Sequence, residues 1–392
     1  MIRHLLKMVW NRKRVNGLIM IEIFVSFLVL FVVLTATAYY VSNYRQPLGY
    51  DIQRVWNIKV NTRLPQKGFD KVQADGLQQL ALAMRDLPEI ESIGWMSMPP
   101  YSHSTWSNGR KFNGQDIVIE INGASDDIQN LLSVPLIAGR WFSKEDDASK
   151  LKPVVINELY ARLIYGDEDP IGKKPLDSTC MIVGVMKEFR KAGEFSAPVC
   201  YQIARFRIED TTKSHNGSFL IRVREGTTAS FQGKLIGVLE SVQKGWSFDI
   251  NELQNDRESD FKLRLAPLIA GGVIAGFLLL MVALGLIGVL WQNVSQRTKE
   301  IGLRRAVGGT ALNVSRQIHG EQFVITSLGI LAGLILVVQL PLLDLIGFIQ
   351  PGVYIAALTI SLILMYALTY LCSVIPGWLA MDIEPAEALH YE

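Results

Sequence analysis

The sequence predicts an α-helical membrane protein with four transmembrane helices and a mixed α+β extracytoplasmic domain inserted between helices 1 and 2. The first observation behind this prediction is composition, because 49% of the 392 residues are hydrophobic and only 19% are charged, whereas soluble domains are about a quarter charged. The second is that the apolar residues gather in uncharged runs, and a helix needs roughly 20 such residues to cross the hydrocarbon core.

These runs divide the chain into segments. Transmembrane helices are expected at 17–41, 265–291, 323–343 and 353–375. The other expected segments are an amphipathic N-terminal helix over 1–16, the extracytoplasmic domain with a helical stalk over 42–264, a basic cytoplasmic segment over 292–322 and a cytoplasmic tail over 376–392. The first apolar run is much longer than the roughly 7–15 residues of a signal-peptide core, so we expect an uncleaved anchor.

Lysine and arginine predict the orientation, because positive residues mark the cytoplasmic side of short loops and span ends. One cluster lies in the first 14 residues, and a second lies between the second and third spans: Arg297, Lys299, Arg304, Arg305 and Arg316. The loop between the third and fourth spans contains neither residue type. Both termini and the segment 292–322 are therefore expected inside the cell, and 42–264 outside.

The extracytoplasmic segment is expected to be mixed in secondary structure. Runs of β-branched and aromatic residues bounded by turn formers predict strands at 55–60, 117–121, 154–156, 181–185, 199–204 and 219–223. Helices are expected at 69–86, at 126–133 with Ser125 as the cap, after Ser143 or Lys144, at 230–244, and at 251–264 as the stalk. Cys180 and Cys200 each fall in a strand-like run outside the cell, where disulfides persist. The sequence leaves a bridge or two free thiols equally open.

No pattern of catalytic or cofactor-binding residues is found. The closest approach to a phosphate-binding loop, Gly166–Lys174, is one residue too long and lacks the final Ser or Thr. The five histidines are scattered without metal-ligand spacing, and the net charge of +2 gives no reason to expect nucleic acid as a partner. We therefore expect no catalytic, cofactor or metal site in the chain itself.

Two features of the spans remain open on sequence alone. Glu22 is ionisable and lies within the first span, where such residues are functional candidates, but its depth also allows the side chain to reach water near the inner headgroups. The pairs Gly272/Gly276 and Gly329/Gly333 favour close helix contact, either within one chain or with another.

The segment between the second and third spans predicts a rigid elbow. The uncharged run before it is longer than a bilayer needs, so the second helix should continue into the cytosol with apolar side chains on its surface. Glu300 and Arg304 are four residues apart and can pair on one face. Gly308 and Gly309 should end this helix, and Thr310 should cap the next. The alternative is an ordinary basic anchoring loop.

At the elbow between the second and third spans, the chain resembles the FtsX-like ABC transporter permease family, MacB type. The resemblance rests on four stretches: Thr298–Gly309 followed by Glu321, Pro135–Phe142, Gly166–Lys173 with Ile182–Val185, and the tail Pro376–Leu389. It covers nearly the whole chain. Gly309 stands where the family usually has Ala, and the ATPase domain fused in the macrolide exporter is not found in this sequence.

The resemblance implies a permease subunit that couples ATP hydrolysis by a separate ABC ATPase subunit to movement of a MacB-like periplasmic core domain. The implied outcome is export of a peptide, drug or lipoprotein. The implied docking site for the ATPase comprises Glu300, Ile301, Gly302, Leu303, Arg304, Arg305, Ala306, Val307 and Gly308. ATP would be bound by the partner, so the chain itself needs no cofactor.

Further partners implied by the resemblance are a second permease chain, identical or different, the lipid bilayer, and a periplasmic adaptor with an outer-membrane channel. The implied location is the bacterial inner membrane, with the large domain in the periplasm. The alternative, from another member of the family, is a non-transporting regulator that activates a cell-wall hydrolase. The sequence identifies no substrate.

Overall fold

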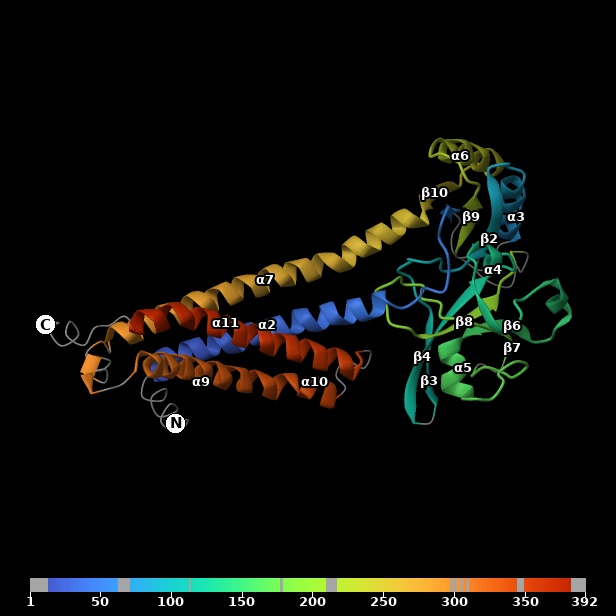
Figure 1. Ribbon diagram of the computed structural model, residues 1–392. Coiled ribbons are helices and arrows are strands. Elements are labelled where there is room, and N and C mark those ends of the chain that lie inside the picture. The colour runs from blue at the N-terminus through green and yellow to red at the C-terminus, as the bar shows by residue number, and fades with distance from the viewer. Residues whose placement is uncertain are drawn as a thin grey trace. The chain divides into compact units, whose positions relative to one another are not determined.

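The structure is a computed structural model that describes residues 13–62, 71–112, 114–176, 179–208, 217–296, 298, 302–303, 306–307, 310–343 and 349–381. The chain forms two compact units, Met1–Ser42 with Arg264–Glu392, and Asn43–Leu263 (Figure 1). The second unit nearly coincides with the segment expected to form the extracytoplasmic domain. The amphipathic helix expected over 1–16 lies mostly outside the described residues, as does most of the tail expected over 376–392.

The first unit is helical. Its helices are α2 (Lys13–Tyr44), α7 (Leu253–Gln296), α9 (Ala311–Val337), α10 (Gln339–Leu342) and α11 (Pro351–Met381), of which α2 and α7 also extend into the second unit. Four stretches of the described residues are long and apolar enough to cross a membrane: Gly17–Tyr44, Leu253–Gln296, Leu312–Leu342 and Pro351–Trp378. Each overlaps one of the four predicted spans, and the predicted fold class is confirmed.

The core of the first unit is built on one face of α2. Ile19, Ile23, Phe27 and Phe31 recur every four residues and are almost fully buried, as expected for side chains on one helical stripe. They share a cluster with residues of the other long helices: Val282 and Leu286, Ile325 and Ile330, and Ala357 and Met365. These helices therefore pack around α2.

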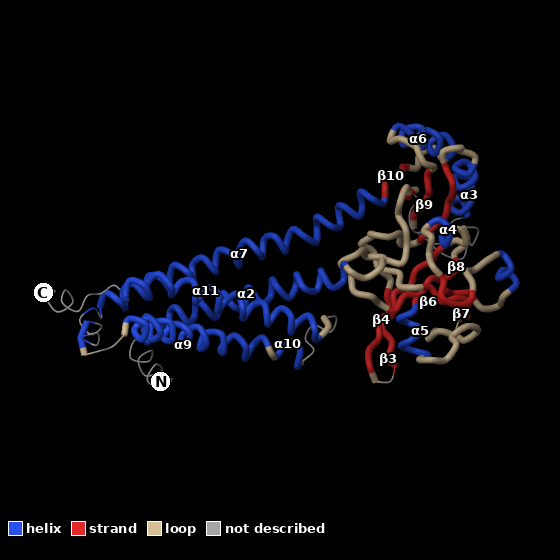
Figure 2. Tube along the Cα trace, in the orientation of Figure 1, coloured by secondary structure: helices blue, strands red, loops and turns tan. Residues whose placement is uncertain are grey.

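The second unit contains one large sheet (Figure 2). Its strands are β1 (Val55–Asn61), β2 (Ile90–Met96), β3 (Ser107–Phe112), β4 (Gln115–Ala124), β5 (Leu136–Gly139), β6 (Lys152–Asn157), β7 (Cys180–Met186), β8 (Cys200–Arg205), β9 (Ser218–Val223) and β10 (Ser247–Glu252). Their order is β10-β1-β9-β2-β4-β8-β6-β7-β5, with β3 paired to β4. The described helical segments are α3 (Lys71–Arg85), α4 (Ile128–Leu131), η1 (Lys144–Ala148), α5 (Glu158–Tyr165) and α6 (Ser230–Val242).

Separate cores stabilise the two halves of this sheet. In the half formed by β10, β1, β9 and β2, Leu77 and Leu80 of α3 and Leu235 and Leu239 of α6 pack with strand residues such as Trp95. In the other half, Tyr160 of α5 packs with residues of β6, β7 and β8. A third cluster joins residues of β2, β4, β8 and β9 with α4.

All six predicted strands are present, but β2, β3, β5 and β10 were not predicted. β3 reads Ser-Asn-Gly-Arg-Lys-Phe, which lacks β-branched residues and has no strand signal. It is extended because each of its residues pairs with one on β4. The stalk helix also begins later than predicted, at Leu253, because Asn251 and Glu252 pair with β1 in β10.

The helix predicted over 126–133 is much shorter. Only Ile128–Leu131 is helical, Asp127 precedes it, and no side chain caps it. Ser125 does not act as the cap, because its Oγ accepts a hydrogen bond from the backbone N–H of Trp95 at 2.9 Å. The prediction at Ser143 is confirmed: its side chain caps η1 in a capping box completed by Asp146.

A bridge between Cys180 and Cys200 is not formed, and both thiols are free. The two strands flank β6, so the strand spacing alone separates them by about 10 Å, beyond the roughly 7 Å that a disulfide can span. Cys180 pairs opposite Lys152 at the start of β6. β8 runs antiparallel to β6, which places Cys200 toward the opposite end.

Candidate functional site

The connection between α7 and α9, residues 297–310, contains the predicted docking residues. Its described part includes Gly302, Leu303, Ala306 and Val307, whereas Glu300, Ile301, Arg304, Arg305 and Gly308 lie outside the described residues. The backbone N–H of Val307 donates to the Leu303 carbonyl at 3.1 Å, the spacing of one helical turn. The Leu303 side chain is 55% exposed and that of Val307 is 83% exposed. Two of the predicted apolar side chains, Leu303 and Val307, are therefore on the surface of the first unit.

The end of the connection is fixed by a helix cap. Thr310 has an extended backbone, and its hydroxyl accepts a hydrogen bond from the Asn313 N–H at 3.3 Å. This bond satisfies one of the unpaired N–H groups at the start of α9. Leu312, in the first turn of α9, is also 55% exposed. The predicted role of Thr310 as the cap is confirmed.

α9 and α11 are joined by polar contacts near this connection. His319 Nδ1 and Ser373 Oγ lie 2.6 Å apart, and Thr326 and Thr369 share a hydroxyl–hydroxyl bond of 2.9 Å. A methyl group added at Gly377 would lie 3.2 Å from the Ser315 hydroxyl, so the two helices approach closely there. Hydrogen bonds between apolar helices hold them in one register, and a displacement at the start of α9 would therefore reach α11 as well.

Glycines bring α9 and α7 close to α2. A side-chain carbon at Gly329 would lie 2.8 Å from Ile23 Cγ2, and one at Gly333 would lie 2.5 Å from Phe27 Cδ1. At Gly272 and Gly276 no described atom lies within 4 Å of that position. Of the two predicted glycine pairs, one therefore makes its close contact within the chain. Gly285 of α7 lies beside Glu22 of α2. A side-chain carbon at Gly285 would lie 2.9 Å from Glu22 Oε2, so glycine leaves room for the carboxylate.

A loop at the other end of α2 and α7 connects both helices to the sheet domain. We call Arg190–Ser196 the collar loop. The Arg190 guanidinium is buried and donates to the carbonyl oxygens of Asn43 at 2.8 Å and Gln46 at 3.0 Å, where α2 ends. It also donates to the carbonyls of Glu194 and Ser196 within the loop. The Asn43 amide in turn donates to the Phe195 carbonyl at 3.1 Å.

The same loop binds the first turns of α7. The Glu194 carboxylate accepts from Arg257 Nε at 2.5 Å and from the Tyr101 hydroxyl at 3.3 Å. Phe195 packs on Phe261 of α7, with ring centroids 5.1 Å apart. Burial raises the pKa of Tyr101, so its hydroxyl stays protonated and remains a donor to Glu194. Within the seven-residue collar loop, Arg190, Glu194 and Phe195 thus contact the end of one helix and the beginning of another.

Sequence reasoning did not find the collar loop. The hydrogen-bond acceptors of Arg190 are backbone carbonyls, which every residue type carries. No pattern of side chains therefore marks the partners of Arg190. The one available signal was the pair of basic residues Arg190 and Lys191, which follows the apolar strand β7. A charged residue is rarely buried unless it is paired, so basic residues this close to a core strand indicate that they have partners. No group of three or more potential metal ligands occurs among the described residues.

The chain is similar to known protein families over most of its length. Residues 18–236 match the model of the MacB-like periplasmic core domain, and residues 272–385 match the FtsX-like permease C-terminal model. Among solved structures, the periplasmic region of MacB from Actinobacillus actinomycetemcomitans covers 53% of this chain and 93% of its own, at 14% identity and a TM-score of 0.38. The extracellular domain of the noncanonic ABC-type transporter YknZ from Gram-positive bacteria covers 50% and 99%, at 13% identity and a TM-score of 0.35.

Curated relatives are longer than this chain. The macrolide export ATP-binding/permease protein MacB of Marinobacter nauticus is 25% identical over 292 residues, covering 72% of this chain and 45% of that protein. The protein of the same name from Escherichia coli (strain K12) is 24% identical over 357 residues, covering 86% and 53%. The chain therefore spans about half the length of the curated relatives it matches.

Proposed function

Because the chain belongs to the FtsX-like permease family and carries a MacB-like periplasmic core domain, we propose that it is the permease subunit of an ABC transporter. In this proposal a partner ATPase hydrolyses ATP, and the permease converts that event into movement of its extracytoplasmic domain. The movement expels a peptide, drug or lipoprotein on the outer side of the bacterial inner membrane. The permease itself supplies no catalytic group. One of the two matching family models is the MacB-like periplasmic core domain, and the curated relatives are named as macrolide export proteins, so the regulator of a cell-wall hydrolase is not favoured.

The observation that carries this proposal is the exposure of Leu303 and Val307 on the α7–α9 connection. In a segment that projects into the cytosol, such side chains have no lipid around them. Burying them in a partner contributes about 25 cal/mol for each Å² of apolar surface removed from water. The docking surface proposed here comprises residues 300–308, of which Leu303 and Val307 are the described apolar contacts.

The path from this surface to the extracytoplasmic domain runs through two continuous helices. α7 is a single helix of 44 residues from Leu253 to Gln296, or about 66 Å at the usual rise per residue. α2 is a single helix of 32 residues that ends at Tyr44. A helix transmits displacement along its axis because successive turns of its backbone are hydrogen-bonded to one another. In α7 one of these bonds is missing, because Pro267 has no N–H to donate. The collar loop contacts α2 at Asn43 and α7 at Arg257 and Phe261, so displacement of either helix acts on the sheet domain there.

The remaining partners of this permease follow from the same proposal. A second permease chain, identical or different, would complete the transporter. A periplasmic adaptor and an outer-membrane channel would continue the export path. A side-chain carbon at Gly272 or Gly276 of α7 would meet no described atom within 4 Å outside the nearby backbone of its own helix, so a second chain could approach α7 there.

The substitution Leu303→Asp tests the docking surface. Asp at this position should weaken co-purification of the permease with its ATPase and lower the ATPase activity stimulated by the permease in proteoliposomes. The matched control is Val118→Asp, because Val118 is also 55% exposed but lies on β4 of the other unit. The control should keep both properties. Normal ATPase binding and coupled activity of the Leu303→Asp protein would place the docking site elsewhere.

A further inference from the structure

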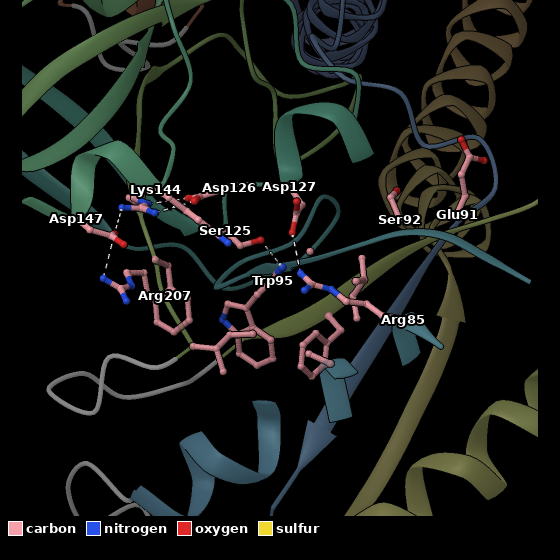
Figure 3. A pocket seen from close by; sticks show the side chains of 17 residues that line it. Arg85, Glu91, Ser92, Trp95, Ser125, Asp126, Asp127, Lys144, Asp147 and Arg207 are labelled. Carbon is pink, nitrogen blue, oxygen red and sulfur yellow. Dashed lines mark hydrogen bonds and ion pairs between the residues drawn. The ribbon is translucent and has the colours of Figure 1, made fainter. Parts of the chain in front are cut away.

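Several charged side chains around the hollow shown in Figure 3 are paired with one another. Arg205 donates to Asp126 at 2.7 Å and to Asp147 at 2.6 Å, and Arg85 donates to Asp127 at 3.3 Å. The outer edge of strand β3 is different. It has a neighbour on one side, β4, and among the described residues no strand is paired to its other side.

The free backbone groups of this edge belong to Ser107, Gly109 and Lys111. The Ile121 N–H donates to the Trp106 carbonyl at 2.9 Å, so the backbone groups of Trp106 face β4. The direction of these groups alternates along an antiparallel strand, so those of residues 107, 109 and 111 point away from β4. All three residues are exposed. The edge therefore presents three N–H donors and three carbonyl acceptors in a row.

The outer half of the β3–β4 hairpin has two strands only (Figure 2). β8 pairs with β4 over Ile119–Ala124, whereas β3 pairs with β4 over Gln115–Glu120. A two-stranded hairpin is marginally stable without further strands or packing, so a strand added to β3 would stabilise it. Exposed edges are often blunted by bulges, as in β5, whose register is irregular next to Leu136. β3 pairs six consecutive residues without such a shift.

The residues of this edge are complementary to a second copy of themselves. Trp106 and Phe112 lie three residues on either side of Gly109. In an antiparallel pair centred on Gly109, Trp106 lies directly opposite Phe112 of the second copy. Aromatic pairs across neighbouring strands are favourable. Trp106 is 68% exposed in the single chain, so this pairing would cover a large apolar side chain.

The charges of the strand favour the same register. It places Arg110 opposite Asn108 and Lys111 opposite Ser107 of the second copy. A register centred on Arg110 or on Lys111 would instead place two like charges opposite each other, which is unfavourable. Ser107 is small, and Glu120 lies beyond it on β4. Lys111 of the second copy can therefore reach over Ser107 toward a carboxylate.

We propose that β3 pairs antiparallel with β3 of a second copy of this chain, with Gly109 opposite Gly109. The pair would form six hydrogen bonds, two at each of three opposed positions, and would join the two hairpins into one four-stranded ribbon. This deepens the proposed function, because it assigns an identical chain and a surface to the second permease. It needs neither nucleotide nor ATPase, so its failure would leave the docking of an ATPase unaffected.

The test is disulfide cross-linking of the full chain in membranes without nucleotide. Gly109→Cys should form a disulfide-linked dimer on oxidation, because opposed residues of this type have Cα atoms about 5.5 Å apart, within the range of a disulfide. Lys111→Cys is the matched control on the same edge. Its two copies would lie about 14 Å apart along the strands and should not cross-link. The three native thiols are buried, and the parent protein serves as the blank.

A second set of variants tests the backbone bonds. Ser107→Cys combined with Lys111→Cys should cross-link, because these positions are opposed, whereas neither change alone should do so. Adding Gly109→Pro should abolish this cross-link, because proline removes an outward N–H while the bonds to β4 remain. Adding Gly109→Ala should preserve it, since no described atom lies within 4 Å of a side-chain carbon there. Both proteins should melt at the temperature of the double-cysteine protein.

Three results would overturn the proposal. The first is the absence of a cross-linked dimer in the Gly109→Cys protein, or its linkage to a different protein instead. The second is equal cross-linking of Gly109→Cys and Lys111→Cys, which would show random collision or another register. The third is equal cross-linking of the double-cysteine protein with Gly109→Pro and with Gly109→Ala, because the outward N–H would then make no difference.

Discussion

Arg190 donates a hydrogen bond from Nη1 to the main-chain carbonyl of Asn43 at 2.8 Å, across 147 positions of sequence. This contact attaches the end of the first long helix to a loop that also binds the start of the second. A buried guanidinium satisfied by carbonyl oxygens is a fixed joint, because moving it would leave both the charge and the carbonyls without partners. The joint has consequences that can be measured.

Arg190→Lys should destabilise the extracytoplasmic domain. An ammonium group is compact and cannot replace a planar fork that reaches carbonyls on α2 and on the collar loop. Each carbonyl left unpaired costs on the order of 1–3 kcal/mol. We expect a lower melting temperature and faster amide exchange in and around Asn43–Gln46. Arg162→Ala is the control, since the Arg162 side chain is 72% exposed in a surface pair. Equal melting temperatures for the two variants would exclude the joint.

The pair Arg140–Asp146 should make stability depend on acid pH. Two hydrogen bonds of 2.8 and 2.6 Å join them, and these bonds lower the pKa of Asp146 below the usual 3.8. A lowered folded-state pKa means that the stabilisation is present above 3.8 and is lost as pH falls through the folded-state value. Asp146→Asn should therefore lower the free energy of unfolding at pH 7 by on the order of 1–2 kcal/mol, measured as a lower melting temperature. Its difference from the parent should shrink below pH 4, and a difference that does not change with pH would contradict this.

The cysteines should be free but protected. Burial raises the pKa of the Cys200 thiol to about 11, so almost no reactive thiolate is present at pH 8. Maleimide should label Cys180 and Cys200 slowly in the native protein and fully after unfolding without a reductant. Mass spectrometry of the unfolded, labelled protein would count the modified thiols. A peptide pair linked through these two residues would show that the strand order β8-β6-β7 is wrong.

Gly333→Leu should disrupt the packing of α9 on α2. A side-chain carbon there would lie 2.5 Å from Phe27, and Phe27 is fully buried in the helical core. We expect a lower melting temperature in detergent, because overpacking typically costs about 1–3 kcal/mol. Gly288→Leu is the matched control on α7, where nothing described lies within 4 Å of a side-chain carbon. If Gly333→Leu melts no lower than Gly288→Leu, this contact is not close.

Local features could be predicted well from the sequence. The spans depend on the length and composition of uncharged runs, and the caps at Ser143 and Thr310 depend on residues within three positions of one another. The exposure of Leu303 and Val307 was predicted because the helix before them is longer than a bilayer requires. The resemblance to a family came from residues around this same connection. Its residues 300, 301, 304, 305 and 308 lie outside the described part, and their docking role remains a prediction.

The sequence by itself determined the number of long apolar helices, the position of the inserted domain and the helix caps at Ser143 and Thr310, since each depends on neighbours in the chain. Only the tertiary structure decided which strands lie next to one another. That order separates Cys180 from Cys200 by placing β6 between them. It makes β3 a strand through its pairing with β4. The collar loop likewise depends on contacts between residues more than 140 positions apart, such as Arg190 and Asn43. Backbone carbonyls are the same at every position, so no sequence pattern could indicate which of them a buried arginine would bind.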